Sequence, residues 1–136
     1  MTRKILAIII GVVVAFSVVM SSEWLGHQIW PLPQNLNWND PTQIAKFMAQ
    51  MPVAAYAWLL FGWLTAVMLG VFVCSRVQRS TAIWPQACTA VLFTAAVTSN
   101  FLLLPHPVWF IVLSALLLCT ASWASVLFFT RPQGPI

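Results

Sequence analysis

Residues 53–74 read VAAYAWLLFGWLTAVMLGVFVC, a stretch in which no side chain is charged. About 20 helical residues, rising 1.5 Å each, cross the roughly 30 Å hydrocarbon core of a bilayer, and this stretch is long enough to do so. A membrane-spanning β-strand would need only about 10 residues of alternating hydrophobicity, and this stretch does not alternate. It therefore predicts a transmembrane α-helix.

The chain contains three more apolar stretches of similar length. The first follows Arg3 and Lys4, as the apolar core of a signal peptide follows its basic residues, but it exceeds the roughly 7–15 residues of such a core. We therefore expect a retained helix, and an all-α integral membrane four-helix bundle with antiparallel up-down topology. The predicted single transmembrane domain covers residues 1–136, with helices at about 5–27, 53–74, 82–104 and 108–129.

The composition indicates that the solvent of this chain is a bilayer rather than water. Hydrophobic residues make up 61% of the chain and charged residues 6%, against roughly 25% charged residues in an ordinary soluble domain. The net charge of +4 does not indicate a nucleic-acid partner, because the basic residues form no stripe with interleaved aromatic residues. The expected partners are the lipid bilayer and either copies of the chain or a larger membrane complex.

The basic residues predict which side of the membrane each end faces. Cytoplasmic segments carry an excess of lysine and arginine. If the N-terminus is cytoplasmic, Lys46 lies outside and all other basic residues lie inside: Arg3, Lys4, Arg76, Arg79 and Arg131. We therefore expect both termini to be cytoplasmic.

The predicted outer loop, residues 31–52, contains the pattern of a short periplasmic amphipathic helix at 41–51. In Asp40-Pro41-Thr42-Gln43, the aspartate suits an N-cap, the proline suits the first helical position and the glutamine suits a capping box. The apolar face of this helix comprises Ile44, Phe47, Met48 and Met51. Two placements fit this pattern equally: on the membrane surface, or against the outer end of the bundle.

Small residues recur four positions apart in the first two long helices. They are Ala7, Gly11 and Ala15 in the first helix and Gly62, Ala66 and Gly70 in the second. Small side chains allow two helix backbones to approach closely, so the pattern predicts a tight helix–helix contact. Such spacing also arises by chance in alanine-rich helices.

Three ionisable side chains, Glu23, His27 and His106, map to the outer end of the predicted bundle. Glu23 and His27 are four residues apart, so a continuous helix places them on one face. His106 lies between two prolines in the turn that joins the last two helices. This trio suits a site for a proton or substrate, or for a divalent metal such as Zn²⁺. The structural alternative is a Glu23–His27 ion pair at the interface, with His106 capping the hairpin or solvated.

The remaining polar side chains carry weaker signals. Asn100, near the outer end of the third span, predicts either a hydrogen bond to a neighbouring helix or a contact with a bound ligand. Cys74, Cys88 and Cys119 form no CxxC pair, and we expect them to be small apolar core residues. The sequence has no Walker loop and no nucleophile elbow, so no residue is predicted to be catalytic.

Three segments of the chain have a distinctive sequence: Glu23-Trp24-Leu25-Gly26-His27, Trp30-Pro31-Leu32-Pro33 and Pro105-His106-Pro107-Val108-Trp109. Together they resemble a family of small, uncharacterised four-span proteins of the bacterial inner membrane, and the resemblance covers most of the chain. It implies a bacterial inner-membrane location and a recurring glutamate and histidine at the outer end. It implies no activity.

Two hypotheses about function follow. The first is a non-enzymatic accessory protein or complex subunit, whose helices supply packing surfaces. The second is a small transporter or metal-dependent membrane enzyme that uses Glu23, His27 and His106 at an outward-facing cavity. Whether those three side chains converge distinguishes the two hypotheses.

Overall fold

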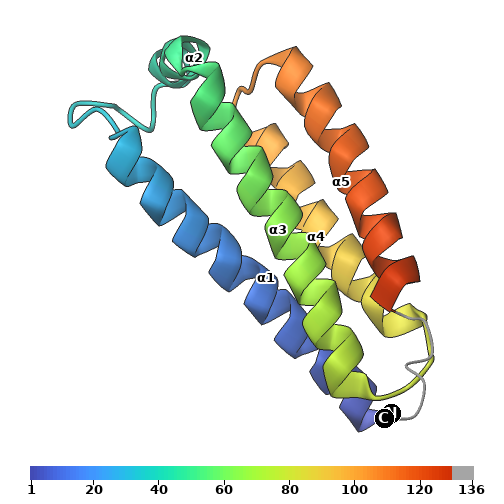
Figure 1. The fold of residues 1–136 in the computed structure, drawn as a ribbon. Coiled ribbons are helices and arrows are strands. Elements are labelled where there is room, and N and C mark those ends of the chain that lie inside the picture. Colours follow the sequence, from blue (N-terminus) through green and yellow to red (C-terminus); the bar gives the residue numbers. More distant parts are fainter. Residues whose placement is uncertain (130–136) are drawn as a thin grey trace.

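The computed structural model describes residues 1–129, which form five α-helices and no strand (Figure 1). They are α1 (Thr2–Ile29), α2 (Pro41–Gln50), α3 (Val53–Gln78), α4 (Trp84–Leu103) and α5 (Val108–Phe129). The four long helices lie alongside one another and alternate in direction, with α2 across one end (Figure 1). The predicted all-α four-helix bundle is confirmed. Arg131, which entered the orientation argument, lies outside the described residues.

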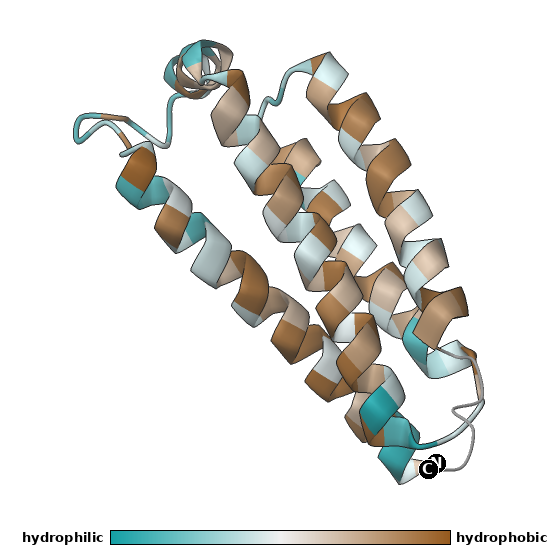
Figure 2. Cartoon of the chain, in the orientation of Figure 1, coloured by the Kyte–Doolittle hydropathy of each residue, from teal (hydrophilic) through white to brown (hydrophobic). Residues whose placement is uncertain are grey.

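The four long helices are each long and apolar enough to cross a membrane. Their outward faces carry large apolar side chains such as Phe61, Val91 and Leu116, each at least 61% exposed. In contrast, Gln86 and Ser114 are fully buried. Apolar colours dominate the length of the bundle, and the most hydrophilic residues gather toward its ends (Figure 2). Since lipid, unlike water, does not drive apolar side chains inward, this distribution is that of a small multi-pass membrane protein.

The helix ends differ from the predicted spans where polar residues prolong a helix beyond its apolar run. α3 continues past the predicted end at residue 74 as far as Gln78, and Arg79 then ends it in the left-handed conformation, with φ of 49°. Gln78 Nε2 donates hydrogen bonds to the carbonyl oxygens of Ser80 and Ala82, both at 3.0 Å. This turn delays the start of α4 to Trp84, two residues after the predicted start.

α3 and α4 occupy the middle of the bundle. Both contact α1 and α5 as well as each other, whereas α1 and α5 are not in contact within residues 1–129. Of the three free cysteines, only Cys74 is buried. The prediction that all three are core residues is therefore wrong for Cys88 and Cys119, which lie on outward faces where the surrounding lipid is as apolar as a core.

The residues predicted to pack helices lie where α1 meets α3. A Cβ atom added to Gly11 would lie 2.7 Å from the carbonyl oxygen of Gly70, and one added to Gly70 would lie 2.8 Å from that of Gly11. Ala66 is fully buried on the same side of α3. A Cβ atom on Gly62 would collide with the side chain of Ser22, 2.9 Å from its Cβ. The two backbones therefore touch at Gly11 and Gly70, and at Gly62 only the small side chain of Ser22 lies between them.

α2 begins as its sequence predicts and packs on the end of the bundle. Asp40 Oδ1 accepts hydrogen bonds from the amides of Thr42 (2.9 Å) and Gln43 (3.4 Å). The capping box is incomplete, because Gln43 Oε1 instead accepts from the amide of Asn37 at 3.3 Å. Ile44 and Met48 are buried in the hydrophobic core. Of the two placements left open by the sequence, the structure shows the one against the bundle.

Candidate functional site

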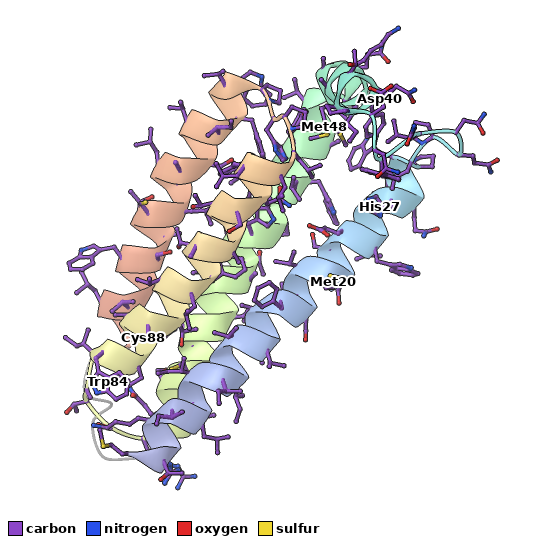
Figure 3. All side chains as sticks on the ribbon, turned by 180° about the vertical axis from the view of Figure 1, so that it is seen from behind. Met20, His27, Asp40, Met48, Trp84 and Cys88 are labelled. Carbon is purple, nitrogen blue, oxygen red and sulfur yellow. The ribbon has the colours of Figure 1, made fainter. Side chains whose placement is uncertain are left out.

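A partly open cavity of about 260 Å³ lies at the end of the bundle that α2 covers. We call it the α2-end cavity. All four residues predicted to bind a ligand line it: Glu23, His27, Asn100 and His106. Figure 3 shows His27 of α1 and Met48 of α2 at this end, and Trp84 and Cys88 at the opposite end. Its volume is close to the lower limit of roughly 300 Å³ for ligand pockets, so it suits a small molecule or a head group.

The cavity exists because the contact between α1 and α3 widens toward α2, as Figure 1 shows. At Gly11 and Gly70 the two backbones touch, but at Gly26 the indole ring of Trp58 lies between them. A Cβ atom on Gly26 would come within 3.1 Å of Trp58 Cδ1. Trp58 Nε1 donates a 2.9 Å hydrogen bond to the carbonyl oxygen of Ser22, which fixes this ring against α1. The ring thus separates the helix ends and forms part of the wall.

Aromatic rings from three elements form a cluster behind the cavity. Phe110 of α5 is at its centre, with ring centroids 4.8 Å from Tyr56, 5.5 Å from His106 and 6.2 Å from Phe101. Trp63 closes the cluster, 5.7 Å from Phe110. Stacked, tilted and edge-to-face pairs at these separations are favourable, so the cluster supports the wall of the cavity.

α2 supplies the roof. Phe47 and Met48 of α2 and its C-cap residue Met51 line the cavity at this end. The Tyr56 hydroxyl donates a 2.7 Å hydrogen bond to the carbonyl oxygen of Met48. That bond ties the last turn of α2 to the wall of α3. Methionine side chains are flexible and polarisable, so this roof can adapt to the shape of a ligand.

His106 is 7% exposed and held in one orientation. Its Nδ1 lies 3.0 Å from the carbonyl oxygen of Leu104, and its own amide donates to the same oxygen at 2.9 Å. His106 therefore caps the hairpin, as the structural alternative proposed. Because a carbonyl oxygen only accepts hydrogen bonds, Nδ1 carries the hydrogen and the neutral ring keeps a lone pair on Nε2. Burial lowers the pKa of His106, and the bond to Leu104 opposes this effect only in part, so the neutral form of the ring is favoured.

The other three predicted residues face the cavity from α1 and α4. Glu23 is partly buried and interacts electrostatically with His27, one helical turn away. Within residues 1–129, no hydrogen bond to the Glu23 carboxylate is found. Asn100 Oδ1 is buried and has no hydrogen-bond partner in the same part of the chain. The predicted hydrogen bond from Asn100 to a neighbouring helix is thus not seen, and the amide remains available to a ligand.

The structure does not bring the histidines and the glutamate together as a metal centre. Among the described residues, no group of three or more His, Cys, Asp and Glu side chains is placed to hold a metal ion. The physical reason is that His106 belongs to the aromatic cluster of α3, α4 and α5, while Glu23 and His27 lie across the cavity on α1. The three residues share a cavity without converging.

Sequence reasoning missed the aromatic side chains of the wall: Trp30, Trp38, Tyr56 and Trp58. Four tryptophans and one tyrosine between residues 24 and 58 were a signal that could have indicated a cavity. Comparison of the chain with models of protein families, with curated proteins and with solved structures finds no match.

Proposed function

We propose that this chain is a small ligand-binding membrane protein and that the α2-end cavity is its binding site. The observation that carries the proposal is that the four polar residues singled out from the sequence line one apolar, aromatic-walled cavity. A mostly apolar pocket with a few polar groups is the usual form of a small-molecule site. Binding a ligand in this cavity would be the first step of the transporter hypothesis. A binding protein without catalysis also fits the hypothesis of an accessory subunit.

A second hollow, the groove between α4 and α5, suits ligand binding less well than the α2-end cavity. The groove between α4 and α5 is larger, about 650 Å³, but among the described residues its polar groups are those of Thr94, Thr98, Cys119, Ser122 and the indole N–H of Trp123. It lies along the outward faces of two membrane-spanning helices, where lipid chains fill such grooves. Among the described residues that line it, none is charged, so no fixed charge there could select a ligand.

Binding is tested by filling the cavity. Ala55 is buried and lines it, whereas Ala57 is exposed two residues away on the same helix. Calorimetric titration in nanodiscs with 1-hexanol, hexanoate and hexylamine is expected to show saturable binding of at least one probe to the wild type and to Ala57→Trp. Ala55→Trp should bind about tenfold more weakly, because the indole occupies the space.

A second variant, Met51→Trp, fills the cavity from the side of α2. It keeps the test valid if Ala55→Trp does not fold. Melting temperatures show which variants are folded. If no probe binds the wild type saturably, or if folded Ala55→Trp and Met51→Trp bind as well as the wild type, the proposal is wrong.

We further propose that the chain resides in a bacterial inner membrane with the α2 end outside and both termini in the cytoplasm. The resemblance of residues 23–27, 30–33 and 105–109 supports the location. The fold supports the orientation, because the basic residues of α1 and α3 share the end opposite α2. There Arg3 Nε donates a 2.8 Å hydrogen bond to the carbonyl oxygen of Val77, and Lys4 Nζ lies 6.0 Å from the ring centroid of Trp84. Excess positive charge marks the cytoplasmic side.

Cysteine labelling tests this orientation. In a chain whose three native cysteines are replaced by alanine, Asn37→Cys should react with a membrane-impermeant maleimide in intact cells. Ser80→Cys, in the exposed loop at the opposite end, should react only after the inner membrane is permeabilised. Gln133→Cys, near the C-terminus, is likewise expected to react only after permeabilisation; Gln133 lies outside the residues that the structure describes. Labelling of Ser80→Cys but not Asn37→Cys in intact cells would reverse the topology.

A further inference from the structure

We infer that the α2-end cavity selects a primary ammonium group attached to an apolar body. The inference rests on the proposed binding function and names the chemistry that this site recognises. It follows from the charge of the cavity, from the hydrogen-bonding groups that its walls leave unused, and from its aromatic rings.

The charge of the cavity favours a cation. The chain has two acidic residues, and one of them, Glu23, lines the cavity. The other, Asp40, is engaged as the N-cap of α2. No lysine or arginine is among the lining residues of the described chain. Two histidines also line the cavity. Burial favours the neutral form of His106, and His27 interacts electrostatically with Glu23 but, within residues 1–129, forms no hydrogen bond or ion pair with its carboxylate, which stays open to a ligand. A carboxylate in a partly apolar site is stabilised by a cationic partner.

The unused hydrogen-bonding groups favour a cation that donates. The acceptors that line the cavity include the Glu23 carboxylate, Asn100 Oδ1 and His106 Nε2. Two of the donors on the wall are already engaged, since Trp58 Nε1 bonds to Ser22 and the Tyr56 hydroxyl bonds to Met48. A primary ammonium has three N–H donors and no acceptor. Its donors can therefore be accepted by these side chains, whereas a quaternary ammonium offers none.

The aromatic wall favours the same ligand. Trp30, Trp38 and Trp58 line the same cavity as Glu23. A cation is attracted to the face of an aromatic ring, most strongly to tryptophan. The methionines and Phe47 of the roof can cover the apolar body of the ligand. Both a free alkylamine and the head group of phosphatidylethanolamine carry this chemistry, and the cavity volume accommodates either.

The test compares four head groups on one hexyl chain, by calorimetric titration of the protein in phosphatidylcholine nanodiscs at about pH 8, where an ordinary histidine is neutral. Hexylamine is expected to bind the wild type about tenfold more tightly than 1-hexanol, hexanoate or hexyltrimethylammonium. Glu23→Gln should abolish most of this preference, and Asn100→Leu should reduce it. The control Gln28→Glu changes charge at an exposed position of α1 that does not line the cavity, and should leave the preference unchanged.

A further arm separates the two sources of the ammonium group. Phosphatidylethanolamine in the nanodiscs should weaken hexylamine binding if the natural ligand is the lipid head group, and leave it unchanged if the ligand is a free amine. Either result supports the inference. If 1-hexanol or hexanoate binds as tightly as hexylamine, the inference is wrong while the binding function stands. If hexyltrimethylammonium equals hexylamine, the argument from hydrogen-bond donors is wrong. If no probe binds, the proposed function itself fails.

Discussion

Gly70→Leu is expected to lower the stability of the bundle by roughly 3 kcal/mol or more, and Gly11→Leu should do the same. Overpacking usually costs about 1–3 kcal/mol when side chains can move aside. Here the obstacle is backbone, because a Cβ atom on Gly70 would lie 2.8 Å from the carbonyl oxygen of Gly11. The whole of α1 would have to move away from α3. Thermal unfolding in one detergent, followed by circular dichroism, measures the effect.

The control for this prediction is Ala57→Leu, which adds a similar side chain to an exposed position of the same helix. Its melting temperature should stay within the experimental error of the wild type. If Gly70→Leu and Ala57→Leu have equal effects, α1 and α3 are not packed backbone to backbone.

Phe110→Ala is expected to have the second largest effect, a loss of roughly 3–5 kcal/mol. Phe110 is 1% exposed, and its ring lies within 6.2 Å, centroid to centroid, of the rings of Tyr56, Trp63, Phe101 and His106. Removing it leaves a void at the centre of the aromatic cluster. The rings that support the α2-end cavity lose their common contact, so binding of hexyl probes should weaken as well.

Phe128→Ala is the matched control for Phe110→Ala. Phe128 lies on the same helix but is 65% exposed, so its ring faces the surrounding lipid rather than the cluster. Its replacement should change the melting temperature little and leave probe binding intact. Comparable destabilisation by the two changes would mean that the cluster does not hold the bundle together.

The parts of the fold that were predictable are those decided by local chemistry. The uncharged stretch at 53–74 is a helix because its length and apolarity leave no other way to cross a bilayer. The start of α2 follows from Asp40 and Pro41, which act on the next few residues only. The end of α3 was not predictable, because it is set by the hydrogen bonds of Gln78 and by the left-handed conformation of Arg79, and hydropathy registers neither.

The candidate site was predictable only in part, for a similar reason. Glu23 and His27 were grouped by their helical spacing, and the hairpin placed His106 at the same end of the bundle. The role of Phe110 could not be predicted, because α5 is apolar on all its faces. Only tertiary packing determines which of these faces is buried. For the same reason the pattern of α2 fitted both a membrane and the end of a bundle: both present an apolar surface.

The most direct test of the binding site is to locate a ligand in it. Crystals of the protein grown with 6-bromohexan-1-amine would show the bromine by anomalous scattering. The account predicts a bromine peak in the α2-end cavity, between α1 and α3 beneath Met48, that is absent from crystals of Ala55→Trp. Bromine found only in the groove between α4 and α5, or equally in the cavity of Ala55→Trp, would contradict it.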